Sequence, residues 1–203
     1  MSVTFDDADA SLVDVAMPVM AEHGISACCY TVPDYVEKGV SWRSSVPRPI
    51  MNWKNLAVWL SAGHEVGSHT LTHASINACS VERVRQEAEW SQDVLQQKLG
   101  ISVDHFAYPW GQHTSKNRET LRGLNVFKSV ATIHRGPMSK GHDPFSLRRD
   151  AASFAIRQNG WSSLCGRLTD SIGFATSGGT GLRTSKRTRR LTGMRSRRAR
   201  PRG

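Results

Sequence analysis

The chain of 203 residues lacks several features that would place it in other classes of protein. Its four cysteines form no C-x-x-C pair, so neither a zinc ribbon nor a thioredoxin-like motif is supported. The adjacent Cys28 and Cys29 lie in an apolar run, and we expect them to pack as small buried side chains. No apolar run reaches the roughly 18 residues of a membrane span, and no signal-peptide pattern follows Met1. The sequence predicts no transmembrane segment and leaves the localisation of the protein open.

Acidic residues are absent from the end of the chain, where basic residues gather. Ten of the 27 Lys and Arg residues lie at or beyond Arg183, together with none of the 17 acidic residues. The other 17 basic residues balance the acidic ones, so residues 1–182 carry no formal net charge and are not predicted to bind nucleic acid specifically.

The basic end of the chain is also poor in apolar side chains. Residues 176–203 cannot bury enough apolar surface to offset the entropy lost on ordering. We therefore predict one folded domain at 1–175 and a disordered, Arg-rich tail at 176–203. A solvated tail is favoured over a tail that contacts anionic surfaces.

Segments with strand and helix patterns alternate along the chain. Short apolar runs predict strands at 2–5, 25–32, 65–68, 105–108 and 126–132. Amphipathic stretches predict helices at 11–24, 53–62, 81–99, 115–122 and 160–172. The stretch 33–49, which contains proline and glycine, is predicted as a loop.

The first predicted helix carries a start signal and an apolar face. Ser11 and Asp14 have the spacing of a capping box at its N-terminus. Its expected buried face consists of Leu12, Val15, Ala16, Val19 and Met20.

Repeated strand–helix units of this length predict an α/β fold with mostly parallel strands covered by helices, either open or closed into a barrel. In such folds, functional side chains gather at the C-terminal ends of the strands. Asp6 with Asp7, His69, and Tyr108 with Pro109 each follow a predicted strand. We therefore expect these residues to lie near one another.

The acidic pair Asp6-Asp7 and the H-x-x-x-H pair His69 and His73 supply the groups of a mononuclear metal site. Two imidazoles and one carboxylate leave coordination positions open for water and substrate. The other carboxylate can remain outside the coordination sphere and act as a base on water. Each pair is a weak signal by itself, but the two together, both after strands, predict a hydrolase that uses a divalent metal.

Three stretches of the chain together resemble the polysaccharide deacetylase family, which contains the NodB homology domain and is also called carbohydrate esterase family 4. The stretches are VTFDD at 3–7, GSHTLTH at 67–73 and FAYPWG at 106–111. They follow the order and spacing of the family motifs, and the third is similar to the Phe-Ala-Tyr-Pro-x-Gly subtype. The resemblance implies a deformed, incomplete (β/α) barrel of the NodB type.

The resemblance also implies roles for the residues of the first two motifs. Asp6 would be the catalytic base, while Asp7, His69 and His73 would hold a divalent metal, usually zinc. The implied substrate is a polysaccharide or an oligosaccharide.

The third motif would line the substrate groove with Tyr108, Pro109, Trp110 and Gly111. A backbone N–H near Tyr108 would help to hold the developing oxyanion. The Trp110 ring suits the face of a sugar, although ordinary packing explains an aromatic residue here equally well.

The sequence departs from the family pattern at two of these motifs. Ala8 stands where a glycine commonly follows the acidic pair. Ala107 stands where many members have an arginine that orients the base. Arg149 is a candidate to supply this charge instead, and the alternative is a solvated surface arginine.

The family histidine that protonates the leaving amine has no counterpart in this sequence. In the Phe-Ala-Tyr-Pro subtype this histidine lies upstream of the first motif, so we expect the chain to be a member truncated at its N-terminus. His134 is a candidate for the missing proton donor, but its position in the sequence does not argue for this role.

These features predict that the protein removes N-acetyl groups from an amino-sugar polysaccharide. One alternative is an O-acetyl polysaccharide esterase, because an alkoxide leaving group depends less on a strong acid than an amine does. The other is a glycan-binding remnant with impaired catalysis.

Overall fold

A computed structural model describes residues 2–39 and 49–151. The predicted helix at 160–172 and the predicted tail at 176–203 lie outside the described residues. So does the predicted domain end at residue 175.

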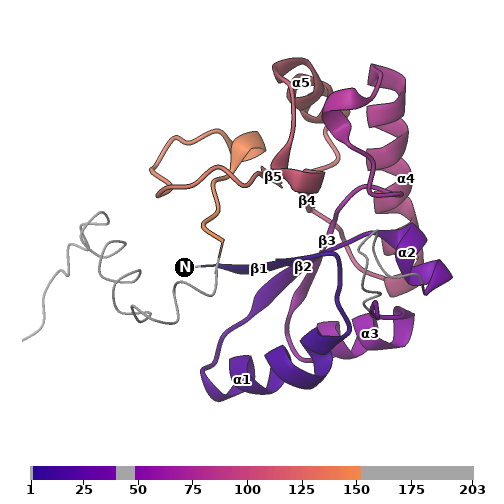
Figure 1. The fold of residues 1–203 in the computed structure, drawn as a ribbon, viewed down its shortest axis with the longest axis vertical. Helices are drawn as coiled ribbons and strands as arrows, with labels where there is room; N and C mark the ends of the chain where they lie inside the picture. The colour runs from indigo at the N-terminus through magenta and orange to yellow at the C-terminus, as the bar shows by residue number, and fades with distance from the viewer. Residues whose placement is uncertain (1, 40–48, 152–203) are drawn as a thin grey trace, which may run out of the picture.

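The described strands form one sheet of five parallel strands in the order of the sequence. They are β1 (Val3–Asp6), β2 (Ala27–Thr31), β3 (Glu65–Ser68), β4 (His105–Ala107) and β5 (Ser129–Ala131). The sheet curls, and the helices lie around its outer side (Figure 1). This arrangement confirms the predicted incomplete (β/α) barrel with parallel strands.

The longer helices connect consecutive strands, as the alternation predicted. They are α1 (Met17–Glu22), α3 (Trp53–Ser61), α4 (Val81–Leu99) and α5 (Ser115–Leu124). Three of them begin at a polar side chain that accepts a hydrogen bond from an N–H group three residues later, and these side chains are Asn52, Ser80 and Thr114. Short 3₁₀ turns follow at η2 (Ile76–Ala78), η3 (Pro109–Gly111) and η4 (Pro144–Ser146).

The predicted capping box at Ser11 is wrong. The Ser11 hydroxyl and N–H both donate to Asp9 Oδ1, so the side chain does not cap the helix. The helix instead begins with a π-helical turn, η1 (Leu12–Ala16), in which the Met17 N–H donates to the Leu12 carbonyl five residues earlier.

The predicted buried face of this first helix is also partly wrong. Leu12 and Met20 are buried as expected, but Val15 and Val19 are 63% and 52% exposed. A π turn holds more residues than an α turn, and it therefore rotates the following side chains away from the positions that a 3.6-residue period predicts.

The predicted loop at 33–49 contains a short helix, α2 (Pro33–Lys38), which the sequence analysis missed. Pro33 occupies the first helical position, where its fixed φ suits the helix and its missing N–H is not needed. The helix ends at Gly39 in the left-handed conformation.

The core lies between the sheet and the outer helices. Its largest fully buried side chains include Trp59, Phe106 and Tyr108. Cys28 and Cys29 are buried as predicted, and burial raises the pKa of the Cys29 thiol to about 12, so this thiol stays protonated at neutral pH.

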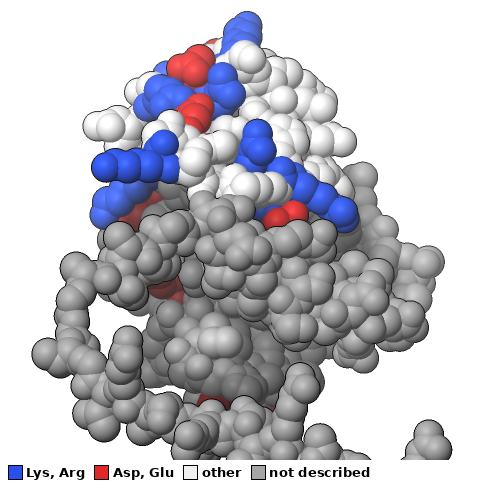
Figure 2. Space-filling model, turned by 90° about the vertical axis from the view of Figure 1, so that its left-hand side faces the viewer, with Lys and Arg blue, Asp and Glu red and all other residues white. Residues whose placement is uncertain are grey.

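The described surface carries mixed charge. Figure 2 shows acidic side chains among the Lys and Arg side chains on the described part of one face. Arg122 on α5, for example, pairs with Glu119 at 3.2 Å and with Asp143 at 2.8 Å. Among the described helices, none combines the length and the apolar character that crossing a membrane requires.

Candidate active site

The C-terminal ends of β1 and β3 bring the two predicted motifs together. Asp6 ends β1, and the N–H of His69, directly after β3, donates to the Thr31 carbonyl at 2.9 Å. The sheet is tight at this point because Gly67 in β3 faces the Tyr30 ring. A Cβ at Gly67 would lie 2.6 Å from Tyr30 Cδ1 and 2.9 Å from the His105 carbonyl.

Asp7, His69 and His73 converge on one point. One carboxylate oxygen of Asp7 and one ring nitrogen of each histidine all lie within 4.8 Å of one another. The Asp7 Oδ1 atom is 3.6 Å from His69 Nε2 and 3.4 Å from His73 Nε2. Ligands of a tetrahedral zinc ion are separated by about 3.3 Å, so the two nitrogens and the oxygen suit such an ion.

The environments of the two imidazoles also suit a metal. His69 Nδ1 lies 2.8 Å from the Ala107 carbonyl, which can only accept, so Nδ1 carries a hydrogen and Nε2 is the ring nitrogen left to ligate. Burial, followed by the nearby His69, lowers the pKa of His73 to about 3, so its ring is neutral at pH 7. A ligating histidine must be neutral, and the His73 ring meets this condition.

The segment between the two histidines is a tight loop rather than a helical turn. Thr70 and His73 both have positive φ values, of 67° and 57°. The Thr70 hydroxyl accepts a hydrogen bond from the Ala74 N–H at 3.2 Å, which turns the chain at His73. The His69 and His73 rings are thereby brought to 4.9 Å between centroids.

Asp6 lies beside this group and is held by Arg149. The guanidinium donates to both Asp6 carboxylate oxygens, at 2.6 and 2.9 Å, and to the Thr132 carbonyl at 2.8 Å. Burial alone would raise the pKa of Asp6, but His69 and the hydrogen bond and charge of Arg149 together outweigh it, so the pKa lies below its ordinary value. The structure thus brings Arg149 into contact with Asp6, and its role in orienting a base stays a prediction.

The third motif forms the neighbouring wall. Trp110 is 44% exposed, and its ring contacts the His73 ring edge to face at 4.3 Å. Gly111 has a positive φ of 64°, and a Cβ there would lie 2.3 Å from Ile133 Cγ1.

Tyr108 is buried, and its two polar groups are both engaged. Its hydroxyl donates to the Phe145 carbonyl at 3.3 Å, and its N–H donates to the Ala131 carbonyl at 3.0 Å. The Tyr108 N–H is thus part of the sheet, and a donor for an oxyanion must come from a neighbouring residue.

Two further histidines follow β4 and β5. The His113 ring stacks on Tyr108 at 4.5 Å and lies 5.7 Å from the His134 ring. The His134 carbonyl accepts the Arg149 N–H at 2.9 Å, which places His134 beside the segment that holds Asp6.

The sequence analysis missed Glu87, a buried carboxylate of α4 that contacts the loop between the two histidines. A signal was present in the pattern. Glu87 lies on the same helix stripe as Val84, Ala88 and Leu95, and a charged residue on a buried stripe requires a polar partner.

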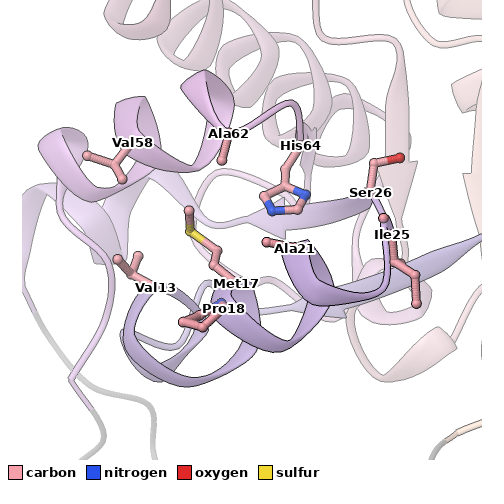
Figure 3. Close-up of a pocket in the computed structure, with 10 residues that line it drawn as sticks. Val13, Met17, Pro18, Ala21, Ile25, Ser26, Val58, Ala62 and His64 are labelled. Atoms are coloured by element: carbon pink, nitrogen blue, oxygen red, sulfur yellow. The ribbon is translucent and has the colours of Figure 1, made fainter.

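A separate pocket of about 560 Å³ lies between α1 and α3 (Figure 3). Its lining is mostly apolar, with Val13, Met17 and Val58 among its side chains. His64 is its titratable group, and that ring packs on Trp59 at 4.2 Å. Because the pocket contains no carboxylate, we place the chemistry at the strand ends instead.

Fold and site together define a class: a parallel (β/α) half-barrel with an Asp-His-His group, able to hold a cation, at the C-terminal ends of its strands. The family model described as polysaccharide deacetylase matches residues 1–127. The chain belongs to the polysaccharide deacetylase family.

Solved structures share the fold. The deacetylase PplD of Streptococcus pyogenes in complex with acetate is 24% identical, with a TM-score of 0.65 over 73% of this chain and 62% of that chain. IcaB from Ammonifex degensii is 26% identical, with a TM-score of 0.64 over 76% and 68%. A de-N-acetylase from Aggregatibacter actinomycetemcomitans is 15% identical, with a TM-score of 0.66 over 78% and 73%. This chain thus spans less than two thirds of the length of PplD.

Proposed function

We propose that this protein is a metal-dependent hydrolase that removes N-acetyl groups from an amino-sugar polysaccharide or oligosaccharide. The observation that carries the proposal is the convergence of Asp7, His69 and His73. Asp6 lies beside them, and Arg149 donates to both of its carboxylate oxygens. We assign the three converging residues to a divalent cation, with zinc as the first choice because the donors are two imidazoles and one carboxylate.

Asp6 is the proposed catalytic base. When bound, a divalent cation supplies Lewis-acid activation of water and of a carbonyl oxygen. Asp6 accepts the proton of the attacking water, and its lowered pKa keeps it ionised and ready at neutral pH. Arg149 fixes the carboxylate plane, so that the accepting oxygen does not rotate away from the water.

Trp110 and its neighbours are the proposed substrate wall. The half-exposed Trp110 ring beside His73 offers an apolar face on which a sugar ring can stack next to the cation site. We assign the oxyanion donor to a backbone N–H near Tyr108 other than that of Tyr108 itself, which donates to the Ala131 carbonyl.

The choice of an N-acetyl substrate rests on two supports. The Phe-Ala-Tyr-Pro-Trp-Gly stretch resembles the subtype found in deacetylases of poly-N-acetylglucosamine, and a protein of the same fold is described as a de-N-acetylase. An amine must be protonated as it leaves. We assign this step to the imidazole of His134, whose carbonyl accepts a hydrogen bond from Arg149 in the segment that holds Asp6.

Acetate release tests the proposal. The full chain with added zinc should release acetate from N-acetylglucosamine oligomers, and Asp6→Asn should lower kcat by at least about 100-fold. Asp93→Asn, an exposed site on α4, is the matched control and should keep wild-type activity.

Two outcomes would contradict the proposal. Faster acetate release from O-acetylated xylan than from the amino-sugar oligomers would identify an O-acetyl esterase. Oligomer binding without turnover, unchanged in Asp6→Asn, would identify a glycan-binding protein.

A further inference from the structure

Glu87 is a charged residue in an apolar setting. It lies on α4 and is 1% exposed, among the buried side chains Val84, Ala88 and Leu95 of the same helix. A carboxylate in such a place is stable only when strong partners replace its lost hydration. The groups that bind the Glu87 carboxylate therefore indicate the structural role of this residue.

The carboxylate is held by Thr72, in the loop between His69 and His73, and by Arg83. The Thr72 N–H donates to Glu87 Oε2 at 2.9 Å, and the Thr72 hydroxyl donates to Oε1 at 2.7 Å. The Leu71 N–H donates to the backbone carbonyl of Glu87 at 3.1 Å. The remaining partner is Arg83, one helical turn earlier, whose guanidinium forms an ion pair with the carboxylate.

The loop needs this support because its backbone is strained. Thr70 and His73 hold left-handed conformations that residues with a Cβ adopt only at a cost in free energy. Helix α4 also contacts the start of the loop, where Ser91 Oγ lies 2.6 Å from Ser68 Oγ, and both side chains are buried. Helix α4 thus holds this segment at two points, Ser68 through Ser91 and Thr72 through Glu87.

We propose that Glu87 is a positioning residue of the cation site: by holding Thr72 with its carboxylate it sets the separation of the His69 and His73 imidazoles. The assignment of the occupant as a divalent cation rests on the proposed function. Glu87 touches neither the cation nor the substrate, and its effect passes through the Thr72 backbone.

The test measures metal binding directly. In the full chain, Glu87→Gln keeps the shape of the side chain but replaces one accepting oxygen with an NH₂ group. We expect its affinity for Zn²⁺, from competition with a chelator, to fall by about 10- to 100-fold. The visible absorption spectrum of the Co²⁺-loaded variant should differ from that of the wild type, because the two imidazoles no longer have a fixed separation.

Glu89→Gln is the matched control. Glu89 lies on the same helix and pairs with Arg85 at 3.5 Å, but it has no contact with the loop among its described interactions. This variant should bind Zn²⁺ with wild-type affinity. Thr72→Val removes one of the two hydrogen bonds to the carboxylate, leaves Glu87 in place, and should weaken Zn²⁺ binding by a smaller factor; it decides the question if Glu87→Gln does not fold.

Different results would contradict the positioning role of Glu87 and the proposed metal-dependent function. Wild-type affinity and an unchanged Co²⁺ spectrum in a folded Glu87→Gln, or in Thr72→Val, would overturn the positioning role and leave the proposed function intact. A wild-type chain that binds neither Zn²⁺ nor Co²⁺ would overturn the proposed function and the positioning role together.

Discussion

At the scale of single residues, the most informative contact is the bidentate pair of Asp6 and Arg149. Many members of the family orient the base with an arginine in the third motif, where this chain has Ala107. Here the guanidinium comes from a residue 143 positions away from Asp6 and reaches the same carboxylate. The charge that contacts the carboxylate therefore comes from a residue far from it in the sequence.

Arg149→Lys tests this contact. Lysine keeps the positive charge but offers a single donating group, so the carboxylate of Asp6 gains rotational freedom. We expect kcat/KM for acetate release to fall by about 10- to 100-fold, with a smaller change in KM. Arg148→Lys, at the exposed neighbouring position, is the control, and equal losses in both variants would contradict the orienting role.

Ala8 shows how a departure from the family pattern is accommodated. Its φ of 58° is one that glycine adopts freely, and its methyl group is fully buried in the core. Backbone strain of about 1–2 kcal/mol is therefore offset in part by the burial of a methyl group.

At the scale of elements, β3 carries the tightest steric constraint next to the site. Gly67 lies within reach of the Tyr30 ring and the His105 carbonyl, so the strand before His69 approaches both neighbouring strands without a side chain between them. The exposed Gly123, in α5, has open space around it and provides a contrast.

These two glycines should respond to alanine in opposite directions. Gly67→Ala should reduce the free energy of unfolding by about 3 kcal/mol or more, because the clash includes backbone that cannot move away. Gly123→Ala should increase it by about 1 kcal/mol, because alanine is the better helix former. Urea unfolding of both variants gives the answer, and a stable Gly67→Ala would refute the proposed close approach.

At the scale of the whole molecule, the pair of Asp6 and Arg149 joins the first strand to the end of the described chain. Thr4 on the same strand accepts a further hydrogen bond from Arg149 at 3.2 Å. Asp143 joins η4 to α5 in a similar way through Arg122, and that guanidinium, after the opposing effect of burial, holds the pKa of Asp143 below its ordinary value.

The lowered pKa of Asp6 predicts how stability depends on pH. A carboxylate whose pKa is lower in the folded state stabilises that state fully above its unfolded pKa of about 4, and this contribution is lost as the pH falls through the folded value. Asp6→Asn should therefore lose about 2 kcal/mol at pH 7 and show a flatter decline in acid than the wild type.

Urea unfolding between pH 7 and pH 2 in the presence of a chelator provides the measurement. Asp93→Asn controls for the loss of one negative charge at an exposed position. Parallel declines of wild type and Asp6→Asn would show that the ion pair does not stabilise the fold.

Local patterns were enough to predict much of this protein. Apolar runs, amphipathic stretches and strand–helix alternation predicted five mostly parallel strands covered by helices, because short-range periodicity reports which face of an element is buried. The order of the three motifs placed Asp7, His69 and His73 at strand ends, and parallel strands bring such ends to one edge.

Other features depended on contacts between distant segments, which local periodicity does not encode. The π turn at η1 exposed Val15 and Val19, and α2 formed inside a predicted loop. Folding alone brought Arg149 to Asp6 and Glu87 to Thr72. The residue types and their order specify the chemistry available to the site, whereas distances of a few ångströms between groups remote in sequence arise only when the sheet and helices pack.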